Sequence, residues 1–164
     1  MNCNWELSYR ADPFALPIAD RHYNRQHVGS PQFVPPGRCI VLLTAAHDAL
    51  WVSSFPEAQY VKHRWAGAWI CTCFRNESLI LSSELIRDAV AVTRWYWGTA
   101  PSLGMITFVD STKVKSKRDW GRCFRKAGFK LCGLTQGGLI ALQLLPVDMP
   151  EPFQPINAQL TLFT

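Results

Sequence analysis

Long apolar runs and charged residues are both scarce in this chain. No uninterrupted apolar stretch reaches the roughly 18 residues that a membrane-spanning helix requires, and the amino terminus lacks the apolar core of a secretory signal. Charged residues make up 18% of the 164 residues and hydrophobic residues 48%, which excludes a disordered chain. We therefore expect a soluble, globular, cytoplasmic protein without a membrane segment.

Paired cysteines of the kind that hold zinc or form redox-active disulfides are also missing. No CxxC pair occurs, and the six cysteines are scattered over Cys3, Cys39, Cys71, Cys73, Cys123 and Cys132. We expect reduced thiols, as is usual in the cytoplasm. Two of them alternate along one expected strand and should face opposite sides of it, so neither is expected to act as a nucleophile.

The charge balance and the proline pattern describe the domain and its partner. The net charge of +5 favours an anionic partner, either nucleic acid or a phosphorylated cofactor. Length and composition fit one core, which we place at residues 1–146. The proline-rich stretch "LPVDMPEPFQP" opens an expected C-terminal tail, 147–164, that should be extended and loosely packed.

Alternating strands and helices are predicted between these limits. Helical spacing is strongest at 82–97, where Ser82 or Ser83 is a natural cap and Gly98 a natural stop. The other expected elements are a helix at 17–27, strands at 39–47, 49–56 and 65–78, a strand at 104–110, a short helix at 120–129 and two strands within 130–145. A strand-helix-strand unit requires a parallel pair, so the expected class is α/β or α+β, with a mixed, largely antiparallel sheet flanked by helices.

Lysine and arginine gather after the strand at 104–110. The cations are Lys113, Lys115, Lys117, Arg118, Arg122, Arg125, Lys126 and Lys130. A run of this kind is either a solvated face or a rim that binds phosphates without reading the base sequence. Trp120 lies inside the run, where an aromatic ring suits an unstacked base.

Three polar residues are candidates for the chemistry itself. His22 can act as a base or a metal ligand, and Tyr23 can donate to a developing oxyanion or stack on a base. On the sequence alone, a His-Tyr pair on a surface helix is more often without a chemical role. Asp110 ends a buried strand, where open α/β sheets place ligands, but it also suits a turn that caps Ser111-Thr112.

A second group of polar residues follows the long strand. Arg75 could pair with a phosphate and Glu77 could serve as a base, or the two could form an ion pair in a structural turn. Ser82 and Ser83 are expected to cap the following helix, with contact to a bound donor as a second possibility.

The ending "RCFRKAGFKLCG", in this order of elements, resembles the GNAT superfamily of N-acetyltransferases over residues 38–145. The resemblance implies a central parallel pair that splays apart, followed by a loop that holds the coenzyme A pyrophosphate with backbone N–H groups. Here the corresponding stretch "FRNESLILSSEL" contains no glycine, which disfavours ordinary acetyl-CoA binding. The implied contacts to a donor are Arg75, Asn76, Ser82 and Ser83.

One branch of that superfamily, the phage Mom-type DNA modification proteins, resembles more of the chain. The similar stretches, in order, are "DRHYNRQH", "FVPPG", "FRNE", "ITFVD" and "GRCFRKAGF". Proteins of this branch convert adenine in DNA to a carbamoylmethyl derivative that protects the phage from host restriction. The resemblance implies an acyltransferase-like enzyme in the host cytoplasm that modifies adenine N6.

The same resemblance assigns roles to individual residues. His22, Tyr23 and Asp110 would form the reaction centre, and His22 would also bind iron if a metal is present. Double-stranded DNA would be held by Lys113, Lys115, Lys117, Arg118 and Arg122. The acyl or glycyl donor stays unidentified, and a homodimer is one option. Two alternatives stay open: an acetyl-CoA-dependent N-acetyltransferase acting on a small amine or a protein, and a non-catalytic nucleic-acid-binding module.

Overall fold

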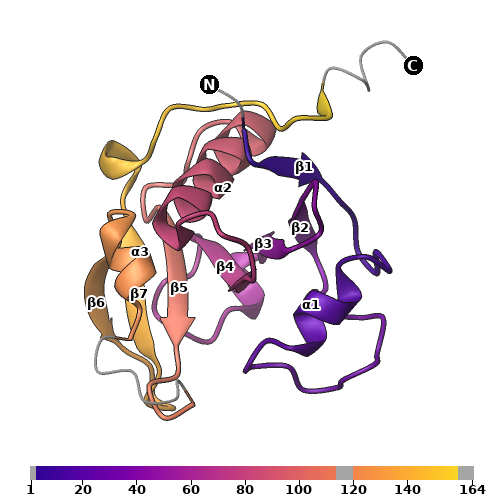
Figure 1. Ribbon diagram of the computed structural model, residues 1–164. Coiled ribbons are helices and arrows are strands. Elements are labelled where there is room, and N and C mark those ends of the chain that lie inside the picture. Colours follow the sequence, from indigo (N-terminus) through magenta and orange to yellow (C-terminus); the bar gives the residue numbers. More distant parts are fainter. Residues whose placement is uncertain (1–2, 114–119, 159–164) are drawn as a thin grey trace.

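The structure is a computed structural model that describes residues 3–113 and 120–158. Over these residues the chain forms one seven-stranded sheet in the order β1-β2-β3-β4-β5-β7-β6, with helices packed on it (Figure 1). The strands are β1 (Trp5–Leu7), β2 (Arg38–Thr44), β3 (Ala49–Phe55), β4 (Trp69–Asn76), β5 (Met105–Val109), β6 (Lys130–Leu134) and β7 (Ile140–Leu144). The helices are α1 (Leu16–Asp20), α2 (Ser82–Trp97), α3 (Arg122–Lys126) and two short 3-10 turns, Ala58–Tyr60 and Pro146–Asp148.

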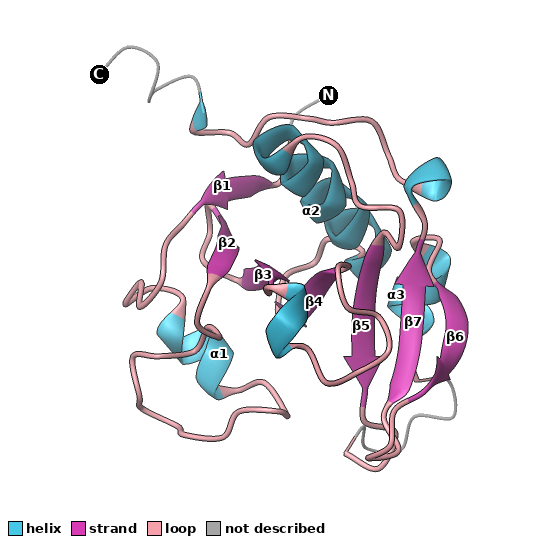
Figure 2. Cartoon of the chain, turned by 180° about the vertical axis from the view of Figure 1, so that it is seen from behind, coloured by secondary structure: helices cyan, strands magenta, loops and turns pink. Residues whose placement is uncertain are grey.

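The parallel pair is β4 and β5, and it is short. Their pairing runs from Trp69 opposite Met105 to Cys71 opposite Thr107. Beyond that point β4 continues to Asn76 beside β3, while β5 continues beside β7. Because each strand follows its outer neighbour, the two separate from each other. The predicted class, a mixed and largely antiparallel sheet with a central parallel pair that splays, is confirmed (Figure 2).

The two faces of the sheet are covered by different helices. The larger core lies under α2 and α3, where Trp5, Trp51 and Trp69 are fully buried. On the opposite face α1 packs Ile18 against the first strands, in a cluster that includes Cys73. Cys71 belongs to the α2 side, so the two cysteines face opposite sides, as expected from their spacing. Both faces are therefore closed by apolar packing, which contributes most of the stability.

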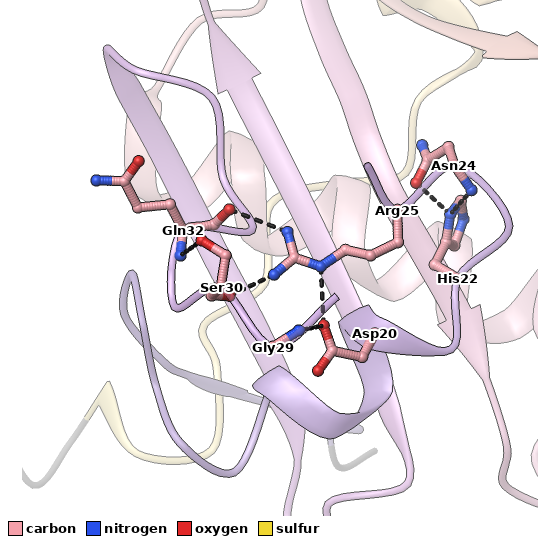
Figure 3. A network of polar contacts seen from close by, with 7 residues as sticks. All are labelled: Asp20, His22, Asn24, Arg25, Gly29, Ser30 and Gln32. Carbon is pink, nitrogen blue, oxygen red and sulfur yellow. Dashed lines mark hydrogen bonds and ion pairs between the residues drawn. The ribbon is translucent and has the colours of Figure 1, made fainter. Parts of the chain in front are cut away.

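The first helix is shorter than predicted, so two candidate residues lie beyond its end. It begins with a proline in its first turn and ends at Asp20. The Asp20 carboxylate accepts hydrogen bonds from Arg25 at 2.9 Å and from the Gly29 backbone N–H at 3.1 Å, which turns the chain back (Figure 3). His22 and Tyr23 thus lie in a turn, and their expected place on a helix is wrong.

The caps of the other helices agree only in part with the prediction. The main helix ends at Gly98 as expected, but its N-cap is Leu81, and no side chain caps it. Ser82 is already the first helical residue. The short helix α3 is followed by Gly128, whose φ of 108° is the left-handed conformation predicted for it.

The described part of the proline-rich segment is packed against the domain, which corrects the expectation of a loose tail. Met149 is buried in the main core, and the Phe153 N–H donates to the Ala91 carbonyl of α2 at 3.1 Å. Asn157 bonds both backbone groups of Leu7, at 2.8 and 3.1 Å. The segment is extended, but it runs across α2 to β1 because these contacts hold it there (Figure 1).

No helix in residues 3–113 and 120–158 has both the length and the apolar character needed to span a bilayer.

A buried chain of hydrogen bonds ties β3 to α2. Trp51 Nε1 donates to Ser53 Oγ at 2.7 Å, the Ser53 and Thr93 hydroxyls are 2.9 Å apart, and Thr93 donates to the Ala89 carbonyl at 2.8 Å. Ser53 and Thr93 are both inaccessible to solvent. The chain therefore satisfies polar groups that could find no water.

We predict that Ser53→Ala lowers the free energy of unfolding by about 1–3 kcal/mol, because it leaves the buried Trp51 N–H without an acceptor. Urea denaturation measures the change. Thr93→Ser is the matched control, since it keeps the hydroxyl and removes only a methyl group. Equal losses in the two variants would contradict a role for the hydrogen bonds.

Candidate functional site

A cleft with a volume of about 990 Å³ opens where β4 and β5 separate. Its walls come from both strands, from the turn after α1, and from the first residues of α2 and α3. The polar residues that line it include Arg21, His22, Tyr23, Asn24, Thr72, Arg75, Asn76, Ser82, Ser83, Thr107, Lys113, Arg122 and Lys126. The fold thus brings together residues that lie as far apart in the sequence as the first helix and the third.

Most of the residues predicted from the sequence meet in this cleft. His22 and Tyr23 lie on one side, and Arg75, Asn76, Ser82 and Ser83 lie where β4 leads into α2. Lys113 and Arg122 line it as well. Lys115, Lys117 and Arg118, the other cations predicted to bind DNA, lie outside the described residues.

His22 and Tyr23 form a stacked pair beside β4. Their ring centroids are 4.6 Å apart with an interplanar angle of 27°. Burial, together with the charge of Arg75, lowers the pKa of His22, while the Asn24 side chain acts in the opposite direction. Burial raises the pKa of Tyr23. At neutral pH the pair therefore offers a neutral imidazole that can accept a proton and a phenol that keeps its own.

Asn24 fixes the His22 ring. Its side-chain oxygen contacts His22 Nδ1, and its backbone nitrogen lies 3.2 Å from the same ring nitrogen (Figure 3). The side-chain contact raises the pKa of His22, as expected when Nδ1–H donates to the amide oxygen. The Asn24 side-chain nitrogen donates to the Thr72 carbonyl of β4 at 3.3 Å. The turn after α1 is thus tied to the inner edge of β4. Sequence analysis did not single out Asn24, although it lies in the quoted stretch "DRHYNRQH".

Glu77 is held by two arginines and is unsuited to act as a base. Its carboxylate lies 2.6 Å from Arg21 and 2.7 Å from Arg75. The hydrogen bond from Arg21, followed by that from Arg75, lowers the pKa of Glu77 from 4.5 to about 2. The carboxylate therefore stays ionised at any working pH. Of the two interpretations, the ion pair in a turn is the one that the structure contains.

Asp110 lies next to the cleft and takes part in a turn. Its Oδ1 accepts hydrogen bonds from the Thr112 backbone N–H at 3.0 Å and the Thr112 hydroxyl at 2.6 Å, which lower the pKa of Asp110. It is not among the residues that line the cleft, but its charge and its backbone both act on the pKa of Tyr23, in opposite directions. Its carboxylate acts here as the turn-capping group that the sequence also allowed, so its geometry favours positioning over proton transfer.

Asn76 organises the loop 77–81 in front of α2. Its side chain donates to the Ile80 carbonyl at 2.7 Å and to Ser82 Oγ at 3.0 Å, and it accepts from the Ser78 backbone N–H at 2.8 Å. The Ile80 N–H is bonded to Ser78 Oγ at 3.1 Å. These loop amides are already occupied, so the backbone cradle that a pyrophosphate would need is not formed by them.

The first residues of α2 present polar groups to the cleft. Ser82 and Ser83 line the cleft, and no side chain caps the first turn of this helix. Uncapped N–H groups at the start of a long helix attract anions. Arg75, Ser82 and Ser83 are therefore the residues that fit an anionic part of a donor, whereas the glycine-free loop does not fit the coenzyme A cradle.

Iron at His22 finds little support in the donor set. Among the described residues no group of three or more histidine, cysteine, aspartate or glutamate side chains is placed to hold a metal ion. Burial also raises the pKa of Cys73 to about 12, which disfavours the thiolate that metal binding requires.

Comparisons of the chain with known protein families, with curated proteins and with solved structures gave no match.

We predict that the pKa of His22 lies below the ordinary value of 6.5 and rises when Arg75 is changed to Gln, because the cationic neighbour disfavours the imidazolium. Histidine ring resonances followed by NMR as the pH is varied measure both values, with His22→Gln to assign the signal. A His22 pKa at or above the ordinary value would contradict the burial of this ring.

We predict that Glu77→Gln lowers the free energy of unfolding by about 1 kcal/mol near neutral pH, a modest effect because the ion pairs are exposed. The folded-state pKa is depressed, so the contribution is complete above 4.5 and is lost as the pH falls toward 2. Urea denaturation of both proteins across this range provides the test. A difference that stayed constant down to the lowest pH would show that the charge of Glu77 is not its source.

Proposed function

We propose that the protein is a GNAT-like transferase that modifies the N6 amino group of adenine in double-stranded DNA, to a carbamoylmethyl-type derivative. The observation that carries this proposal is the cleft between the splayed strands. A proton acceptor and a proton donor line one wall, the open start of α2 lines another, and cations surround both. The volume of the cleft lies at the upper end of the range for ligand pockets, about 300–1,000 Å³.

The cations favour a polyanionic substrate. Arg21, Arg75, Lys113, Arg122 and Lys126 all border the cleft. Glu77 balances only part of this charge, since one carboxylate is shared by two arginines. A DNA backbone would be held at this rim by charge, with an affinity that falls as salt is added. The target adenine would enter the cleft unpaired, because its N6 is otherwise hydrogen-bonded inside the duplex.

His22 and Tyr23 are the residues proposed to carry the reaction. The donor supplies an electrophilic carbon, which adenine N6 attacks to form the new N–C bond while the bond to the leaving group breaks. His22, neutral at the working pH, accepts the proton that N6 loses. Tyr23 keeps its proton and donates a hydrogen bond where negative charge develops. The negative charge of Asp110 adds to burial in raising the pKa of Tyr23, which helps the phenol to keep its proton.

An acetyl-CoA-dependent N-acetyltransferase is the second candidate. The open first turn of α2, next to separated parallel strands, favours it because that turn can bind phosphate. The occupied amides of the loop 77–81 count against it. Isothermal titration calorimetry with coenzyme A distinguishes the two: micromolar binding that is weakened by Arg75→Gln supports the acetyltransferase.

Nucleoside mass spectrometry tests the leading proposal. Plasmid DNA from cells that express the protein should contain a heavier deoxyadenosine, whose mass identifies the added group. His22→Gln should lower its amount by about a hundredfold or more, as expected for loss of a general base, and Tyr23→Phe should lower it to a lesser degree. His27→Gln, in the same stretch of sequence, is the matched control.

Unmodified DNA from cells that contain the folded protein would overturn the proposal. Modification that is unaffected by His22→Gln would leave the activity in place but move the reaction centre elsewhere.

A further inference from the structure

Two leucines are exposed in the loop 77–81, which leads into the cleft at Leu81. Leu79 is 106% exposed and Leu81 is 71% exposed, and Leu81 also lines the cleft. A single exposed leucine needs no explanation, but two such side chains in one short loop beside a candidate site do. Leu81 lies where a substrate would approach, and Leu79 is two residues before it.

The loop that carries these leucines is held by several hydrogen bonds. Asn76 bonds to three of its groups, and Ser78 Oγ both donates to Asn76 at 2.6 Å and accepts from the Ile80 N–H at 3.1 Å. The Glu77 N–H donates to the Asp48 carbonyl at 2.7 Å, which anchors the loop to the β2–β3 turn. Ile80 packs against the main core. With its neighbours bonded in this way, Leu79 projects into solvent.

Cations line the cleft beside the loop, among them Lys113, Arg122 and Lys126. Arg75 and Arg21 lie there as well, with part of their charge offset by Glu77. Apolar side chains next to a cationic cleft match duplex DNA, whose phosphates flank an apolar stack of bases. Proteins that open DNA insert such wedges between base steps, at a cost of a few kcal/mol per step.

We infer that Leu79 and Leu81 form a wedge that enters the base stack of duplex DNA and holds open the base pair whose adenine occupies the cleft. This inference rests on the proposed function and deepens it. A cleft alone does not separate a base from its stack. Leu81 lines the cleft, so in the complex it would contact both the base stack and the space that the flipped base fills.

Fluorescence of 2-aminopurine tests the wedge without any donor. This adenine analogue brightens when it leaves the stack, and short duplexes that carry it opposite thymine in varied contexts serve as probes. The full-length protein should raise the signal, and Leu79→Ala should reduce the fraction of open base by about tenfold while phosphate contacts keep most of the affinity. Leu79→Phe should retain opening. Val147→Ala, 86% exposed on the 3-10 turn Pro146–Asp148, is the control.

The outcomes separate the wedge from the proposed chemistry. Modified plasmid DNA together with unchanged 2-aminopurine opening in Leu79→Ala would overturn the wedge and leave the function standing. Opening that depends on Leu79 without any modified nucleoside would support the wedge and overturn the chemistry. Binding of wild type, but not Leu79→Ala, to phosphatidylglycerol vesicles, with no change in fluorescence, would assign the leucines to a lipid surface and overturn the inference.

Discussion

The short parallel contact between β4 and β5 is the constraint on which the site depends. Each strand is fully engaged on its outer side, so neither can bend back toward the other beyond Cys71 and Thr107. Polar groups on the inner edges need partners from outside the sheet. The Thr72 carbonyl finds one in the Asn24 side chain. The turn that carries His22 is therefore held in place by the same separation that creates the cleft.

Near the end of β4 the cleft has more positive than negative side chains. Two arginines share one glutamate, so the turn after α1 and the end of β4 are joined while a positive charge remains. That charge acts on His22 as well, because Arg75 disfavours protonation of the ring. The Arg75 side chain thus takes part both in holding two segments together and in keeping the imidazole neutral.

The elements with a hydrophobic period could be predicted from the sequence, whereas the features that depend on single polar contacts could not. The strands and α2 followed from their hydrophobic patterns, whereas β1 has only the residues Trp5–Leu7 and carries no period to detect. The end of α1 depends on Asp20 bonding Arg25 and Gly29, and the proline-rich segment is held by Asn157. Glu77 and Asp110 each allowed two interpretations, because their partners become visible only when the chain is folded.

The C-terminal segment covers the outer edge of β1, where the sheet would otherwise be open. The outer side of β1 would otherwise expose the Trp5 carbonyl and both backbone groups of Leu7, which are bonded instead by the Ile156 N–H and the Asn157 side chain. Open strand edges recruit other chains into aggregates. The residues that protect this edge come more than a hundred positions later in the chain. During synthesis the outer edge of β1 is therefore unprotected until nearly all of this sequence has left the ribosome.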